Sequence, residues 1–213
     1  MALHANPAAT RIVIVAPESL HAEPGDEAAA LEAERSRSLR IGLLEAGYNI
    51  VAVLPADMYL PDRLAQIQPD LIIVDAESQA RDTLEHVVTA TRDARRPIVL
   101  FTDDNDTSQV RAAIAAGVTA YVVAGLAPVR VRPVLEVAMA RFQHEEALRQ
   151  ELADARSRLH DRKVVERAKG LLMKHHGIAE QQAYALLRKT AMDKGLKLSD
   201  VAQRIVDVAE LLG

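Results

Sequence analysis

The length, composition and charge of the chain set the first bounds on its class. Its 213 residues suffice for one domain of ordinary size and a smaller second one. The chain has no cysteine, which excludes disulfides and thiolate metal sites, and its lack of Trp argues against recognition of rows of stacked bases. The net charge of −4 hides an asymmetry, because residues 160–213 hold 10 basic and 7 acidic side chains, including all six lysines. This basic end favours an anionic partner, unless it is only a solvated helical surface.

The start of the sequence has no feature of an export signal. Residues 1–9 contain no Lys or Arg, and the first apolar run, 12–16, is far too short for a signal peptide or a membrane span. We therefore expect a cytoplasmic protein that makes no contact with a membrane.

The first 130 residues alternate apolar, β-branched runs with helical segments. The predicted strands are 11–16, 50–54, 71–75, 98–102 and 120–124. The predicted helices between them are 28–46, 61–68, 79–93 and 107–116. Nearly continuous apolar strands are typical of a parallel sheet covered by helices on both faces. The pattern predicts an α/β domain over residues 1–130, with a doubly wound, five-stranded parallel sheet of the flavodoxin or receiver type.

The remaining sequence predicts helices only, because all nine prolines lie at or before Pro133. A long helix should begin between 128 and 133 and end at Gly177. Two shorter helices should follow at 179–192, closed by Gly195, and at 199–212, with Ser199 as the N-cap. Their apolar faces, which include Leu186 and Val208, predict a compact three-helix unit.

The long helix carries a short apolar seam. Its members follow a 4-3-4 spacing and are Leu148, Leu152, Ala155 and Leu159. This spacing predicts a coiled coil within a linker helix over residues 131–160, and hence a homodimer. The alternative is a helix that packs back on its own α/β domain.

One polar site is predicted at the carboxyl edge of the sheet. Asp75 ends the third strand and Thr102 ends the fourth, a pairing similar to the phosphoacceptor site of receiver domains. Such a site also needs an acidic pair after the first strand to hold Mg²⁺ and a Lys after the fifth. Those positions read Ala16-Pro17 and Ala124. We therefore expect a degenerate receiver without Mg²⁺, in which Asp75 is a polar anchor; the alternative is a phosphorylated Asp75.

Motifs of enzymes and cofactor sites are missing. The first strand is followed by Ala16-Pro17-Glu18-Ser19, which lacks the glycines of a phosphate-binding loop. There is no nucleophile elbow and no His spacing suited to a metal. The adjacent pair His175-His176 is expected to interact with the helix dipole. The sequence predicts a protein that is not an enzyme and that holds no cofactor or metal.

The C-terminal third carries the most specific motif. Residues 164–173 read VVERAKGLLM, followed by Ala183-Tyr184, Leu187-Arg188, Ala191-Met192 and Val201-Ala202. This pattern closely resembles the ANTAR domain, the antitermination module of the AmiR and NasT regulators, over residues 149–211. With the receiver-like domain before it, the chain resembles the NasT type, the nitrate-responsive antiterminators.

The resemblance implies a transcription antiterminator that binds hairpins in a nascent leader RNA. The basic side chains expected to contact RNA are Arg167, Lys169, Lys174, Arg188, Lys189 and Lys197. We expect them to face outward, and we expect Gly170, which costs a helix about 1 kcal/mol against Ala, to allow a neighbouring helix to pack closely. The resemblance also implies control by a separate ligand-sensing protein (NasS-like).

The alternative function is that of a DNA-binding two-component response regulator. It would be activated by phosphorylation of Asp75, and its last two helices would form a helix-turn-helix. Against it, those helices lack a dense run of base-reading Arg, Asn and Gln.

Overall fold

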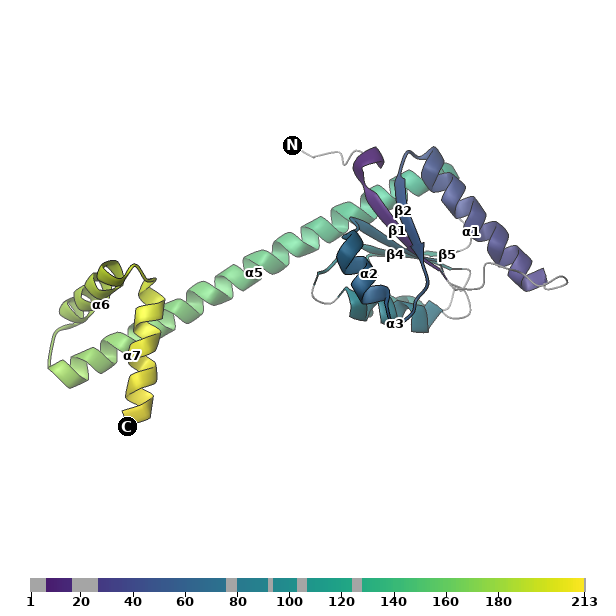
Figure 1. Cartoon of the computed structure of the whole chain (residues 1–213). Coiled ribbons are helices and arrows are strands. Elements are labelled where there is room, and N and C mark those ends of the chain that lie inside the picture. Colours follow the sequence, from purple (N-terminus) through teal and green to yellow (C-terminus); the bar gives the residue numbers. More distant parts are fainter. Residues whose placement is uncertain are drawn as a thin grey trace. The chain divides into compact units, whose positions relative to one another are not determined.

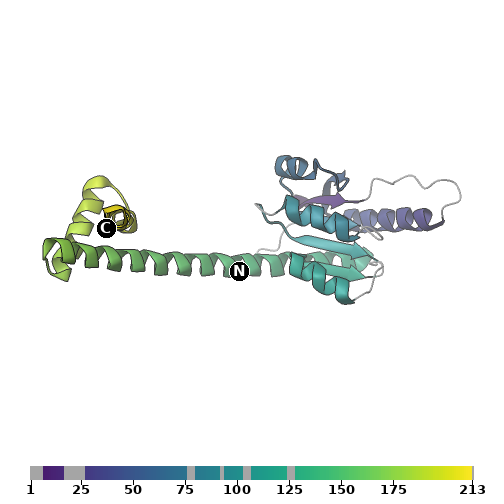
Figure 2. The same cartoon turned by 90° about the horizontal axis from the view of Figure 1, so that it is seen from below.

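The computed structural model describes residues 7–16, 27–75, 80–91, 94–102, 107–123 and 128–212. The chain divides into two compact units, Met1–Glu145 and Glu146–Gly213 (Figure 1). Each unit has hydrophobic clusters of its own. One helix of 49 residues, α5 (Pro128–His176), runs unbroken through the boundary between the units (Figure 2). No helix in the described part of the chain is long and apolar enough to cross a membrane.

The first unit is built on a five-stranded parallel sheet with the strand order β2-β1-β3-β4-β5. The strands are β1 (Arg11–Val15), β2 (Asn49–Leu54), β3 (Leu71–Asp75), β4 (Ile98–Thr102) and β5 (Ala120–Val123). The predicted doubly wound sheet is confirmed. The strands were predictable because their apolar runs face helices on both sides, so that β1, β3 and β4 are buried along nearly their whole length.

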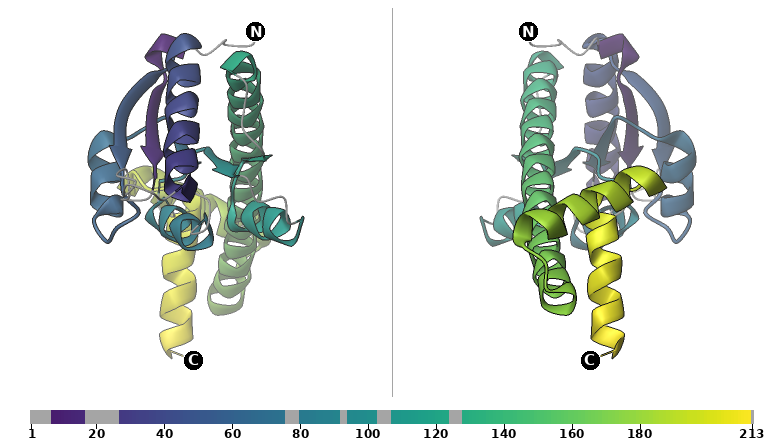
Figure 3. Two further views of the ribbon diagram at one scale, coloured as in Figure 1. Left: turned by 90° about the vertical axis from the view of Figure 1, so that its right-hand side faces the viewer. Right: turned by 90° about the vertical axis from the view of Figure 1, so that its left-hand side faces the viewer.

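Helices cover both faces of this sheet. They are α1 (Glu27–Glu45), α2 (Leu60–Ile67), α3 (Ala80–Ala90), α4 (Thr107–Ala116) and the first turns of α5. Ile12 and Ile14 point to one face, where they pack with residues of α1 and of the first turns of α5, which cover that face (Figure 3). Val13 and Val15 point to the other face, where they pack with α2, α3 and α4. The period-two alternation along β1 therefore divides the core into two layers.

The second unit consists of the end of α5 with α6 (Glu180–Lys194) and α7 (Leu198–Leu212). Small side chains lie where the three helices meet: Ala168, Ala183 and Ala202 are fully buried. Leu172 and Leu187 fill the rest of this core. Gly177 and Gly195, with φ of 63° and 62°, close α5 and α6 in the left-handed conformation, as predicted.

Details of this unit correct the sequence-based expectations. Helix α7 begins at Leu198, so Ser199 lies inside its first turn and is not the N-cap. Leu186 and Val208 are 43% and 53% exposed, whereas Val206 is buried in their place. A Cβ on Gly170 would meet nothing within 4 Å, so the expected packing of a helix against this glycine is wrong.

Candidate functional site

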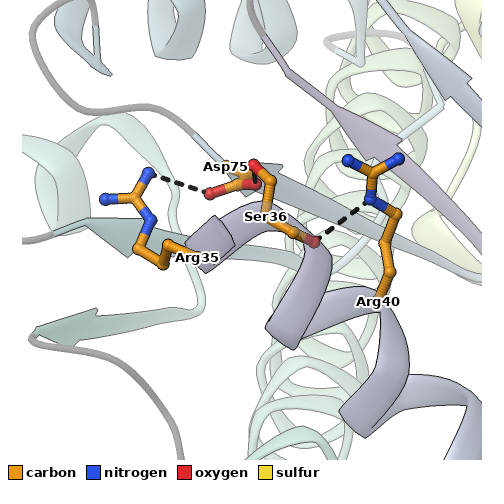
Figure 4. Close-up of polar contacts among 4 residues, drawn as sticks. All are labelled: Arg35, Ser36, Arg40 and Asp75. Carbon is orange, nitrogen blue, oxygen red and sulfur yellow. Dashed lines mark hydrogen bonds and ion pairs between the residues drawn. The ribbon is translucent and has the colours of Figure 1, made fainter. Parts of the chain in front are cut away.

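The carboxylate of Asp75 is buried and engaged by two donors from its own chain (Figure 4). It ends β3 and is only 2% exposed. The guanidinium of Arg35 donates to Oδ1 at 3.1 Å, and the hydroxyl of Ser36 donates to Oδ2. Both donors come from consecutive residues of α1, and the backbone oxygen of Ser36 accepts in turn from Nε of Arg40. The arrangement ties α1 to the carboxyl edge of the sheet.

This arrangement bears on the chemistry open to Asp75. An in-line attack on a phosphoryl group needs an accessible carboxylate oxygen and cations placed around the incoming phosphoryl oxygens. Here one guanidinium compensates the carboxylate charge directly, and both oxygens already accept hydrogen bonds. Thr102 lies at the end of the neighbouring strand and is also buried. Pro17 and Ala124, the positions where charges were missing, lie outside the described residues.

Sequence reasoning missed Arg35 and Ser36. A signal for Ser36 was available, because this residue is spaced with Leu39 and Leu43 along the buried face of α1. A serine at an apolar position of a helix needs a partner, and the nearest candidate was the aspartate at the end of a central strand. Among the described residues, no group of three His, Cys, Asp or Glu side chains could hold a metal ion.

The apolar seam lies on the exposed middle of α5. Leu148 and Leu152 are each 52% exposed, and Leu159 is 60% exposed. Every residue from 147 to 160 is exposed, Ala155 included. Three leucines at this spacing share one face of the helix, and no residue that the structure describes covers that face.

Lys169 does not face outward, contrary to the prediction. Its residue is 7% exposed, and its ammonium contacts Glu180 of α6 at 2.6 Å and Glu166 at 2.9 Å. The hydrogen bond to Glu180, followed by the one to Glu166, raises the pKa of Lys169 above its usual range. The same bond to Lys169 lowers the pKa of Glu180. Lys169 therefore joins α5 to the first turn of α6.

The other predicted RNA-binding side chains are exposed. They are Arg167, Lys174, Arg188, Lys189 and Lys197. The guanidinium of Arg167 forms an exposed ion pair with Glu210 of α7 at 2.8 Å, which contributes little to stability. Arg188 and Lys189 are adjacent on α6 and point about 100° apart. Because Lys169 is buried against Glu166 and Glu180, it does not share an outward surface with Arg167 and Arg188.

A different basic surface is formed on α5. Lys163, Arg167, Gly170 and Lys174 are all exposed and follow a 4-3-4 spacing, which places them on one side of the helix. We call these four residues the basic strip. It spans about 16 Å along the helix axis, and at its centre the missing side chain of Gly170 leaves the backbone open. Sequence reasoning missed Lys163, although the regular spacing was a readable signal.

The chain joins a five-stranded parallel sheet of receiver topology to a small helical unit with a basic face. A family model of the ANTAR domain matches residues 153–206. The transcriptional regulatory protein PdtaR of Mycobacterium tuberculosis is 34% identical over 166 residues, which make up 78% of this chain and 80% of that protein. The chain therefore belongs to the ANTAR-domain transcriptional regulators that carry a receiver-like domain.

Two further similarities cover parts of the chain. The nitrate regulatory protein of Klebsiella oxytoca is 39% identical over 61 residues, which make up 29% of this chain and 15% of that protein. A CheY-like response regulator receiver domain protein from Methanospirillum hungatei JF-1 has a solved structure with 17% identity and a TM-score of 0.45, covering 64% of this chain and 98% of that one.

Proposed function

We propose that the protein is a transcription antiterminator that binds hairpins in nascent leader RNA through the basic strip. The observation that carries the proposal is the exposure of Lys163, Arg167 and Lys174 around the open backbone of Gly170, inside the segment that matches the ANTAR model. Phosphates attract such cations without regard to sequence, and a helix surface that lacks a side chain lets a sugar–phosphate backbone approach closely.

A competition experiment separates RNA binding from the DNA-binding alternative. Stem-loop RNAs with a fixed stem and a randomised loop are selected on the full chain, and the best binder is then competed with duplex DNA of the same stem sequence. We expect the RNA to win and its affinity to fall steeply with salt, because each phosphate contact releases counterions. Tighter binding of the duplex DNA would overturn the proposal.

The basic strip itself is tested by neutral substitutions. Lys163→Gln and Lys174→Gln should each weaken hairpin binding by about 1–3 kcal/mol and reduce the salt dependence. Arg111→Gln is the matched control, since Arg111 is exposed on α4 in the other unit. Unchanged hairpin affinity in the double variant of Lys163 and Lys174 would move the RNA site elsewhere.

We also propose that two chains pair through Leu148, Leu152, Ala155 and Leu159. The support is an exposed apolar stripe at the spacing of a coiled coil, which no described segment of the chain covers. Leu152→Asp places an unpaired charge in this interface and should convert a dimer to a monomer in sedimentation. Val137→Asp is the matched control, because Val137 is 68% exposed on the same helix outside the seam. A wild-type chain that sediments as a monomer at every concentration would refute the pairing.

We propose further that a ligand-sensing partner protein controls the regulator, rather than phosphorylation of Asp75. The support is the engagement of both carboxylate oxygens by Arg35 and Ser36. We expect no stable labelling of Asp75 by acetyl phosphate with Mg²⁺, and nearly normal hairpin binding by Asp75→Asn. Stoichiometric labelling that disappears in Asp75→Asn would contradict this.

A role in nitrate assimilation is the finer proposal. Its support is the similarity of 61 residues of this chain to the nitrate regulatory protein of Klebsiella oxytoca. Deletion of the gene should then abolish the nitrate-dependent rise of full-length transcripts from nitrate-assimilation operons. Unchanged read-through in the deletion strain would assign the regulator to another input.

A further inference from the structure

A second surface of the C-terminal unit has the properties of a ligand site. An apolar groove of about 650 Å³ opens between the end of α5, the end of α6 and α7. Leu172, Val201 and Ile205 contribute to its apolar lining, and Val208 lies at its exposed side. The volume is in the range of small-molecule sites. Neither the basic strip nor the seam lies in this groove.

The groove has basic side chains and no acidic ones around its apolar lining. Lys194 comes from the end of α6, Arg204 from α7, and His175 and His176 from the end of α5. Within the part of the chain that the structure describes, no ion pair engages Lys194 or Arg204. An apolar cleft whose charged lining side chains are Lys194 and Arg204 complements a ligand that is flat and apolar at its centre and negatively charged on its flanks.

A nucleotide of a single-stranded RNA loop has this combination of properties. Its base offers an apolar face, and the phosphates on both sides carry the charge. The strip and the groove meet only along the axis of α5, because Lys174 of the strip directly precedes His175 of the groove while neighbouring side chains of a helix point about 100° apart. A hairpin whose backbone follows the strip would bring its loop to the end of α5, and the loop would reach the groove by turning around that end.

We propose that the groove binds one unpaired base of the RNA loop, with Lys194 and Arg204 contacting the phosphates on either side. This inference rests on the proposed RNA-binding function. Unpaired loop bases can be splayed out of the stack, and apolar side chains then shield the base from water. The strip would supply affinity for any backbone, whereas the groove would select the loop.

The test places 2-aminopurine at each loop position, in turn, of the best stem-loop RNA from the selection described above. On binding to the full chain, we expect the fluorescence of one position to rise, because its base leaves the stack and enters a groove whose lining has no Phe, Tyr or Trp. Val208→Asp should abolish that rise and weaken hairpin binding by about 10-fold or more. Val208 is 53% exposed, so this change spares the core. Arg204→Gln should weaken binding with the fold fully retained.

The matched controls are two substitutions at exposed residues outside the groove. Leu211→Asp changes an 85% exposed leucine of α7 outside the groove, and Arg111→Gln removes a distant charge. Both should bind the hairpin like wild type. One outcome would overturn the inference and leave the proposed function standing. In it, the wild type binds the hairpin, no 2-aminopurine position changes its fluorescence, and Val208→Asp and Arg204→Gln bind as tightly as their controls. The groove would then fit an acidic peptide instead. Failure of wild type to bind any hairpin would overturn the proposed function as well.

Discussion

The contact between Arg35 and Asp75 can be broken without disturbing the shape of the receiver core. Arg35→Met keeps most of the aliphatic stem and removes the charge, while Asp75 stays buried at 2% exposure. Removing one partner of a buried ion pair costs about 3–5 kcal/mol. Since the hydroxyl of Ser36 still donates to Oδ2, we expect the lower end, about 3 kcal/mol. At a urea dependence of about 2 kcal/mol per M, the unfolding midpoint of this unit should fall by about 1.5 M.

A double-mutant cycle assigns this loss to the pair itself. Asp75→Asn removes the carboxylate charge but keeps Arg35. The side chain of Arg35 is 14% exposed, compared with 2% for Asp75, so solvent reaches its charge more easily. In the double variant neither charge is left unpaired, so its loss should be smaller than the sum of the single losses by about 2 kcal/mol. The assay is urea unfolding followed by near-ultraviolet circular dichroism, in which buried Tyr48 reports on the receiver core. Equal midpoints for wild type and Arg35→Met, or additive losses, would refute the reasoning.

Other expectations concern the C-terminal unit. Gly170→Ala should stabilise this unit by about 1 kcal/mol in thermal melts, since the new Cβ meets nothing within 4 Å; a lowered melting temperature would mean that the site is not open. The same substitution should weaken hairpin binding in a gel shift, because it covers the backbone at the centre of the basic strip. Glu180 has a lowered pKa because of its bond to Lys169, so its stabilising effect is present above its usual pKa of 4.5 and is lost as the pH falls through the lower folded value. Glu180→Gln should therefore flatten the decline of the melting temperature between about pH 5 and pH 3; a decline as steep as that of wild type would contradict this.

The sheet and the helices were predictable because each rests on a local pattern. The runs that form β1, β3 and β4 are apolar throughout, and Gly177 and Gly195 end helices at positions where only a positive φ fits well. Such patterns need no knowledge of what lies across the fold. The seam around Leu152 was also readable locally, because its 4-3-4 spacing of apolar residues needs no knowledge of the rest of the fold.

The candidate sites were less predictable because they depend on partners distant in sequence. Lys169 looks like any other lysine of a basic segment, and only the fold brings Glu180 to its ammonium. Likewise, Arg35 and Asp75 are 40 positions apart. A glycine inside a helix lowers the stability of that helix, and this correctly marked Gly170 as an unusual position. The sequence could not show whether Gly170 contacts a neighbouring helix or lies on an open surface.

The exposed middle of α5 has a consequence for its backbone. Residues 147–160 are all exposed among the residues that the structure describes, so their amides are protected from solvent exchange only by the hydrogen bonds of a single helix. An unsupported helix of about this length is marginal in water. These amides should exchange quickly in a monomer and slowly once a second chain lies along the seam. Deuterium uptake in this stretch would therefore report the fraction of paired chains at any concentration, without a label or a substitution.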